Sequence, residues 1–330
     1  MNDTQRSPII NVKNLTRKFK DFTAVNAVSF DVFEGEIFGF LGPNGAGKTT
    51  TINMLSTLLK ISGGEATING KSVSRERTAV RKSIGLVFQE STLDEDLTAR
   101  ENLRFHAEFY GLQKDLYASR SEELLSIVDL SDRADEVVKN FSGGMKRRLE
   151  IARGILHHPK VLFLDEPTIG LDPQTRSAMW QYIRKVAKQN NITVFMTTHY
   201  LNEAEYCDRI AVMDKGKIVA LDTPNNLKKL VGGDIITLAT SDNVMAKKEI
   251  ETRFHVEVRQ DEDKLVAVVE NGNELLPTII KELPQNVLSI ELKEPTLDDV
   301  FIKLTGSKIR EQEVSNVEKT KRFLRKRGRM

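Results

Sequence analysis

A glycine-rich stretch between a predicted strand and a predicted helix constrains the fold more than any other feature. Residues 42–49 match the pattern G-x-x-x-x-G-K-[ST] in full. An apolar run at 37–41 precedes them as a short buried strand, and 50–59 continue with a helical pattern. Glycines let backbone N–H groups close around phosphate oxygens, and the helix adds its positive end. We therefore expect a phosphate site formed by Gly42, Pro43, Asn44, Gly45, Ala46, Gly47, Lys48, Thr49 and Thr50.

Two side chains of this stretch carry specific expectations. Lys48 should reach the β- and γ-phosphates of a nucleotide, and the Thr49 hydroxyl should bind Mg²⁺. The alternative is an ordinary glycine-rich turn. An ordinary turn would not require the strand and the helix that flank these residues, so the flanking elements favour a phosphate site. ATP with Mg²⁺ is therefore the predicted ligand.

An acidic pair follows a second apolar run. Residues 161–164 predict a buried strand that brings Asp165 and Glu166 to the carboxyl edge of the sheet, where such sheets bind ligands. Asp165 is expected to hold Mg²⁺. Glu166, which alternation along a strand would point away from Asp165, is expected to polarise an attacking water. Acidic residues after a strand are more often helix caps or solvated, so this prediction depends on the glycine-rich stretch in the same chain.

Apolar runs that alternate with helical patterns predict an α/β core with a largely parallel sheet. The runs lie at 37–41, 84–88, 161–164 and 193–197. Residues 97–158 lack strand signals and predict a helical insertion, whereas 9–32 predict an antiparallel β piece. These patterns predict a nucleotide-binding domain over residues 1–230, with a helical subdomain at about 94–158.

Composition shifts near residues 224–233. Beyond that point the patterns predict strands and helices in the order βαββαβ, which is the ferredoxin-like arrangement. We expect a small α+β domain at 231–305, closed by a short helix at 298–305, and a basic flexible tail at 306–330.

Composition excludes several classes of protein. The formal net charge is only +2, which gives no overall basic field for nucleic acid, so no nucleic-acid partner is expected. Cys207 is the one cysteine, so no disulfide can form within the chain. The first residues lack the apolar region of a secretory signal, and no apolar run approaches the 18 residues of a spanning helix. A role at a membrane would therefore require a membrane partner.

A third segment narrows the family. Ser142 can cap a following helix, while Gly143 and Gly144 leave backbone donors bare for a phosphate; a simple helix cap is the alternative. With this segment the chain resembles the ATP-binding subunits of ABC transporters, whose signature is LSGGQ. Here the signature segment, residues 141–145, is FSGGM. Phe141 keeps the apolar anchor, whereas Met145 loses the polar side chain of the family's glutamine.

Further residues match family motifs in the same order. Gln89 matches the Q-loop glutamine, which in the family approaches the metal and the attacking water. Asp172 lies in a match to the D-loop at 170–173, which crosses a dimer interface, and His199 matches the switch histidine that senses the γ-phosphate. Phe19 occupies the position of the aromatic residue that stacks on adenine. Each residue alone suits a structural role, and it is their order over residues 8–225 that indicates the family.

Within that family the chain resembles exporters of the daunorubicin-resistance and nodulation-factor type. The resemblance lies in residues 35–41, 49–55, 146–153 and 295–301. It implies an ATPase that powers export of a drug, lipid or polysaccharide-like molecule through a separate integral-membrane permease, at the cytoplasmic face of the membrane. It also implies a head-to-tail dimer, most simply of two copies, with ATP between the glycine-rich loop of one subunit and Ser142, Gly143 and Gly144 of the other.

A soluble ABC ATPase that acts on ribosomes or DNA is the alternative function. Such proteins usually carry two cassettes or a long coiled coil between the nucleotide motifs. This chain has one cassette, with no sustained heptads between residues 42 and 142.

The C-terminal end is basic. Attraction to anionic lipid is one interpretation, and RNA binding or a solvated tail without a ligand are the alternatives. The basic residues are Lys319, Lys321, Arg322, Arg325, Lys326, Arg327 and Arg329.

Overall fold

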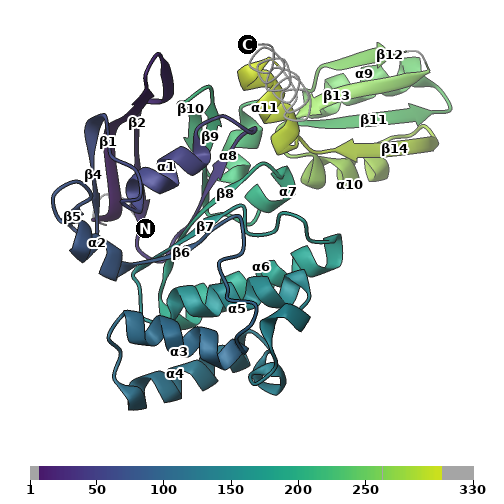
Figure 1. Cartoon of the computed structure of the whole chain (residues 1–330). Coiled ribbons are helices and arrows are strands. Elements are labelled where there is room, and N and C mark those ends of the chain that lie inside the picture. The colour runs from purple at the N-terminus through teal and green to yellow at the C-terminus, as the bar shows by residue number, and fades with distance from the viewer. Residues whose placement is uncertain (1–6, 262, 307–330) are drawn as a thin grey trace, which may run out of the picture. The chain divides into compact units, whose positions relative to one another are not determined.

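The computed structural model describes residues 7–261 and 263–306 (Figure 1). They form two compact units, which meet in sequence between Asp222 and Thr223 rather than near residue 230. The second unit begins earlier because helix α8 (Pro224–Lys229), at the start of this unit, packs on helix α11 (Leu297–Thr305), near the end of the same unit. Lys303 of α11 strengthens this contact by donating to the carbonyl oxygen of Leu230 at 2.6 Å.

Two sheets build the first unit. One is antiparallel, in the order β2-β1-β4-β5, and the other has six strands in the order β10-β9-β3-β8-β7-β6. All neighbours in the larger sheet are parallel except β10 and β9. This confirms the predicted α/β core. The strands are β1 (Pro8–Phe19), β2 (Phe22–Phe33), β3 (Ile37–Leu41), β4 (Gly63–Ile68), β5 (Lys71–Ser72), β6 (Ile84–Val87), β7 (Val161–Asp165), β8 (Thr193–Thr198), β9 (Arg209–Asp214) and β10 (Lys217–Asp222).

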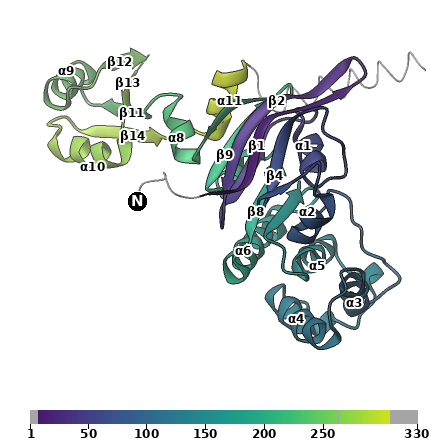
Figure 2. The same cartoon turned by 90° about the vertical axis from the view of Figure 1, so that its left-hand side faces the viewer.

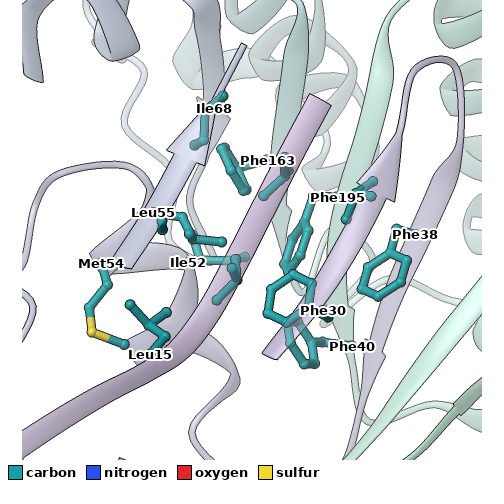
Figure 3. Packing of buried hydrophobic residues seen from close by; sticks show 14 of the residues in the cluster. Leu15, Phe30, Phe38, Phe40, Ile52, Met54, Leu55, Ile68, Phe163 and Phe195 are labelled. Carbon is teal, nitrogen blue, oxygen red and sulfur yellow. The ribbon is translucent and has the colours of Figure 1, made fainter. Parts of the chain in front are cut away.

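A cluster of aromatic side chains joins the two sheets (Figure 3). Phe30 of β2 packs edge-on against Phe40 of β3, with ring centroids 5.1 Å apart, and Phe40 lies 5.0 Å from Phe195 of β8. Each buried ring of this kind contributes about 1.5–3 kcal/mol by leaving water. Every residue of β7 and β8 is buried, so apolar residues follow one another at 161–164 and 194–196 rather than alternating with polar ones.

Helix α1 (Lys48–Leu55) is shorter than predicted from residues 50–59. It begins within the glycine-rich stretch, and it ends before Thr57, whose φ of 68° is left-handed. Its inner face contributes Ile52, Met54 and Leu55 to the cluster in Figure 3. The aromatic and aliphatic packing therefore fixes the helix that the phosphate loop precedes.

The helical insertion is confirmed over residues 97–158, where a single bridge, Thr98–Val137, is the one β feature of these described residues. Thr98 begins α3 with a capping box formed with Glu101. Figures 1 and 2 show α3, α4 and α5 gathered together. Besides α1, the α-helices of the first unit are α2 (Arg77–Ser83), α3 (Ala99–Phe109), α4 (Lys114–Ile127), α5 (Gly143–Ile155), α6 (Pro173–Asn190) and α7 (Leu201–Ala204).

The second unit contains the predicted βαββαβ order. Its four strands are all antiparallel, in the order β12-β13-β11-β14, which is the ferredoxin-like topology. The two helices of this order, at Asn243–Phe254 and Gly272–Glu282, cover one face of the sheet, where Ile250 and Ile279 pack with Ile236 and Leu238 of β11. The elements are β11 (Asp234–Thr240), α9 (Asn243–Phe254), β12 (Val258–Asp261), β13 (Lys264–Val269), α10 (Gly272–Glu282) and β14 (Val287–Lys293).

No helix in residues 7–261 and 263–306 has both the length and the apolar composition that a membrane crossing requires. Apart from Gly306, the tail expected at 306–330 lies outside the described residues.

Candidate active site

The glycine-rich loop connects β3 to α1 and depends on its glycines. Gly45 and Gly47 have φ of 84° and 105°, in the left-handed region that other residues rarely adopt. A Cβ at Gly47 would lie 2.6 Å from the carbonyl oxygen of Ala24, and one at Gly42 would lie 2.3 Å from that of Met213. Only glycine therefore allows the loop to pack this closely against its neighbours.

Lys48 turns its ammonium group into this loop. The residue is 4% exposed, and its Nζ donates to the carbonyl oxygens of Gly42 at 2.7 Å and Pro43 at 3.2 Å. The same Nζ lies 3.4 Å from Glu166 Oε1. A buried cation is thus held at the loop, where it can bind the oxygens of a phosphate.

Thr49 and Asp165 place two hard oxygen donors side by side. Thr49 Oγ1 donates to Asp165 Oδ1 at 3.2 Å, and Thr197 Oγ1 donates to the same oxygen at 2.5 Å. Burial raises the pKa of Asp165 above its usual range, against the effect of these two hydrogen bonds. A bound Mg²⁺ would favour the ionised form, and a hydroxyl with a carboxylate is a donor set that suits this ion.

Glu166 follows β7 with φ of 47°, so it leaves the extended conformation of the strand. Its N–H donates to Thr197 Oγ1 at 3.0 Å, which helps to fix this conformation. The expectation that Glu166 points away from Asp165 is therefore wrong. Both carboxylates reach the loop, Asp165 at Thr49 and Glu166 at Lys48.

The Glu166 carboxylate also approaches the predicted switch histidine. His199 Nδ1 lies 3.2 Å from Glu166 Oε1, and His199 follows the end of β8. Burial alone would raise the pKa of Glu166, but His199 and Lys48 together hold that pKa below its usual range. The carboxylate is thus ionised at neutral pH, which is the state that a general base requires.

Other predicted residues lie outside this contact network in the described structure. Gln89 is exposed just after β6. Phe19 is 42% exposed at the end of β1, and the Arg17 guanidinium lies 4.4 Å from its ring centroid. Asp172 caps α6, because its Oδ1 accepts from the N–H groups of Gln174 and Thr175 at 3.1 and 3.0 Å.

The signature segment contacts residues in and beside the D-loop match of its own chain. Ser142 caps α5 by accepting from the N–H of Met145 at 3.3 Å, and both Ser142 and Gly143 are exposed. A Cβ at Gly144 would lie 2.7 Å from Thr175 Cγ2, so a side chain there would require Thr175 of α6 to shift. This half of the predicted site therefore presents a bare helix start to the outside.

Two supporting groups were missed by the sequence reasoning. Thr197 is directly opposite Asp165 in the pairing of β7 with β8, so the neighbouring strand ends offered a signal. Glu203, which is 1% exposed, accepts from Thr168 Oγ1 and, at 2.6 Å, from Thr198 Oγ1. It thereby ties the loop after Glu166 to the strand that precedes His199.

Comparison with known proteins identifies both units. Residues 25–169 match the family model described as ABC transporter, and 223–305 match that of the ATP-binding protein DrrA1-3-like C-terminal domain. The linearmycin resistance ATP-binding protein LnrL of Bacillus subtilis (strain 168) is 35% identical, covering 92% of this chain and 100% of its own. The daunorubicin resistance ATP-binding protein DrrA2 of Streptomyces coeruleorubidus is 38% identical, covering 90% and 95%. The Nod factor export ATP-binding protein I of Burkholderia lata is 35% identical, covering 92% and 98%.

Solved structures give the same answer for the first unit. CbiO1 from Clostridium perfringens, part of the ABC transporter complex CbiONQ, superposes with a TM-score of 0.63 at 27% identity, covering 75% of this chain and 96% of its own. The bacterial ABC transporter cassette MJ0796, solved as a dimer, gives a TM-score of 0.59 at 30% identity, covering 65% and 98%. These findings confirm the resemblance to drug-resistance and nodulation-factor subunits. The chain belongs to the ATP-binding subunits of ABC transporters and is an ATPase that powers transport across a membrane.

Proposed function

We propose that this ATPase drives export through a separate integral-membrane permease, from the cytoplasmic face of the membrane. Relatives named for linearmycin resistance, daunorubicin resistance and Nod factor export each align over at least 90% of this chain. Their alignments include the C-terminal unit, whose family model is also named after a drug-resistance protein. This favours a drug, lipid or polysaccharide-like cargo over the alternative of a soluble ATPase on ribosomes or DNA.

The site residues then take the following roles. Lys48 and the N–H groups of the glycine-rich loop bind the β- and γ-phosphates. Thr49 and Asp165 would hold Mg²⁺, which neutralises phosphate charge. No three His, Cys, Asp or Glu side chains gather as a metal site in the described parts of the chain, so phosphate oxygens, water and Gln89 would supply the remaining contacts. Glu166 polarises the attacking water, and His199 orients Glu166 and contacts the γ-phosphate.

The observation that carries this assignment is the ion pair between Lys48 and Glu166, at 3.4 Å and almost fully buried. A γ-phosphate would compete for Lys48 and draw it from the carboxylate. Because Lys48 lowers the pKa of Glu166, its departure makes the carboxylate more basic when substrate is bound. The site would thus strengthen its base as it binds ATP.

The exposed half of the site requires a second subunit in this proposal. Ser142, Gly143 and Gly144 would bind the γ-phosphate of an ATP that is held by the loop of another copy, Phe19 of that copy would stack on adenine, and Asp172 would lie at the interface. ATP then joins two copies, and its hydrolysis loosens them. The resulting shift between open and closed dimers would reach the permease through the loop after Gln89.

Purification of the full chain from detergent-solubilised membranes tests the exporter function. The expected result is co-purification of a protein with several membrane spans, together with ATPase activity that requires Mg²⁺. Recovery of ribosomes or DNA with the chain, and no membrane protein, would support the soluble alternative instead.

The basic tail is proposed to contact anionic lipid beside the permease. Removal of residues 307–330 should leave ATPase activity unchanged and weaken binding to vesicles that contain phosphatidylserine, at low salt more than at high salt. Vesicle binding that is equal with and without the tail would contradict the lipid contact.

A further inference from the structure

A buried ion pair on helix α5 has no role in the site described so far. Arg147 and Glu150 lie one turn apart on α5, are 6% and 3% exposed, and approach at 2.9 Å between Nη1 and Oε2. Burial of two charges is costly unless their remaining donors and acceptors are also satisfied. The partners of this pair therefore indicate what it does.

Three of these partners belong to the segment that carries the proposed base. Arg147 Nε donates to the carbonyl oxygen of Pro167 at 2.6 Å, and Nη2 donates to those of Asp165 at 3.2 Å and Glu166 at 3.1 Å. These carbonyl groups include that of Glu166 and lie on both sides of it. A left-handed conformation at such a residue persists only where its surroundings fix it, and Arg147 contributes to that fixation together with Thr197.

The other partners lie in the segment that contains Gln89. Arg147 Nη1 donates to the carbonyl oxygen of Phe88 as well as to Glu150. Glu150 Oε1 accepts from the N–H of Thr92 at 2.9 Å, and Arg153, on the same helix, donates to the Thr92 carbonyl oxygen at 2.7 Å. All five N–H donors of the Arg147 guanidinium are thus used, in a planar arrangement that lysine cannot reproduce.

We propose that Arg147 is a positioning residue for ATP hydrolysis, with Glu150 as its partner. Together they hold the backbone of residues 88–92 and 165–167 against the helix that begins at the signature segment. The proposal rests on the function proposed above, in which Glu166 activates water. A displacement of α5 would move both segments at once, so the occupancy of the signature of one chain would be transmitted to the Glu166 of that same chain.

Arg147→Lys tests this role, because it keeps the charge and loses the planar fork. Arg120→Lys is the matched control: Arg120 is 5% exposed and donates to the carbonyl oxygens of Leu156 at 2.7 Å and Ile155 at 3.0 Å, at the far end of α5. Both variants remove an arginine that binds backbone carbonyl groups around this helix, and only Arg147→Lys affects the segments of the active site.

The measurements are kcat and KM for ATP with Mg²⁺, the Kd of a fluorescent ADP analogue, and the thermal unfolding midpoint, all on the full chain. For Arg147→Lys we expect kcat to fall by roughly 10- to 100-fold, the loss typical of displaced supporting groups. The Kd for ADP should change by less than about twofold, since the phosphate loop is intact. Arg120→Lys should keep kcat even if its unfolding midpoint falls.

Two results would overturn the proposal. The first is an unchanged kcat in folded Arg147→Lys. The second is a fall of both kcat and ADP affinity in Arg147→Lys and in Arg120→Lys alike, in proportion to the stability that each variant loses. If Arg147→Lys does not fold, Glu150→Gln decides in the same assays. A lower kcat with an unchanged Kd for ADP then supports the pair, and an unchanged kcat rejects it. Absence of hydrolysis in the wild-type chain would instead reject the proposed function.

Discussion

The two halves of the proposed nucleotide site are built in opposite ways. The phosphate-binding half is buried and interlocked: Lys48 is 4% exposed and Glu166 is 6% exposed, and each contacts the other. The signature half is open, with Ser142 and Gly143 exposed at the start of α5. Charges taken out of water need partners already in place, whereas backbone donors at a helix start can remain in water until a phosphate arrives.

In the proposed dimer, this difference separates the groups that would hydrolyse ATP from the segment that would complete the site. The chain places Lys48, the pair Thr49 and Asp165, and Glu166 together, so in the proposed site one subunit would hold the groups that act on the γ-phosphate. Its signature segment contacts residues in and beside the D-loop match of the same chain and is presented outward. Variants in the two halves should therefore fail differently.

The largest effect is expected for Lys48→Ala in the buried half. Loss of the main cation for the β- and γ-phosphates should lower turnover on the order of 1000-fold and also weaken nucleotide binding. The exposed Lys71, which pairs with Glu76 at 3.5 Å, gives the control variant Lys71→Ala, which should hydrolyse ATP normally. Normal turnover in Lys48→Ala, measured as phosphate release, would show that Lys48 does not bind the phosphates as proposed.

Glu166→Gln should separate binding from hydrolysis within the same half. The amide keeps the shape and loses the base, so turnover should fall by about 100-fold or more while ATP still binds. The variant should then accumulate as an ATP-bound dimer, visible by size-exclusion chromatography. Glu36→Gln is a control for a buried carboxylate. Glu36 is 7% exposed, its Oε1 lies 3.3 Å from Arg209 Nη1, and this pair lies outside the glycine-rich loop. A Glu166→Gln protein that stays monomeric and active would contradict the role of Glu166.

A smaller effect is expected at the exposed edge of the site. Phe19→Ala should raise KM for ATP and leave kcat nearly unchanged, because loss of base stacking costs about 1–3 kcal/mol of binding. Phe22 is the matched control: it pairs with Phe19 across the turn between β1 and β2 and is 64% exposed. If Phe22→Ala raises KM as much as Phe19→Ala does, the adenine does not stack specifically on Phe19.

Structural features that depend on consecutive residues were predicted correctly. The phosphate loop is eight consecutive residues with a strand before it, and the ferredoxin-like unit shows as six short periodic segments in order. Helix α1 was predicted too long, because its end depends on the left-handed Thr57 rather than on a break in periodicity.

Features that depend on distant backbone atoms were missed. Arg147 is held by carbonyl oxygens of Phe88, Asp165, Glu166 and Pro167, and a carbonyl acceptor leaves no trace in the identity of its residue. The direction of Glu166 was predicted wrongly for a related reason. Alternation holds only while the backbone is extended, and Glu166 has already left the strand.

In the proposed dimer, one subunit supplies the glycine-rich loop of each site and the other supplies the signature segment. Gly143→Asp should block the signature by bulk and by negative charge beside the γ-phosphate. A Cβ at Gly143 meets Leu171 Cδ2 at 3.8 Å, an ordinary contact, so this variant should fold, whereas a Cβ at Gly144 would require Thr175 to shift. Lys48→Ala and Gly143→Asp should each be inactive as homodimers.

Mixing these two inactive variants tests whether each nucleotide site is shared between two subunits. In a mixed dimer the defective loop faces the defective signature, which leaves the other site with an intact loop and an intact signature. Random mixing makes half of the dimers mixed, so independent sites predict recovery of about a quarter of wild-type activity. Strict coupling of the sites would suppress turnover, so the decisive measurement is ATP occlusion in verified mixed dimers. A site shared between subunits predicts one occluded ATP per mixed dimer, and mixed dimers that occlude no ATP would rule it out.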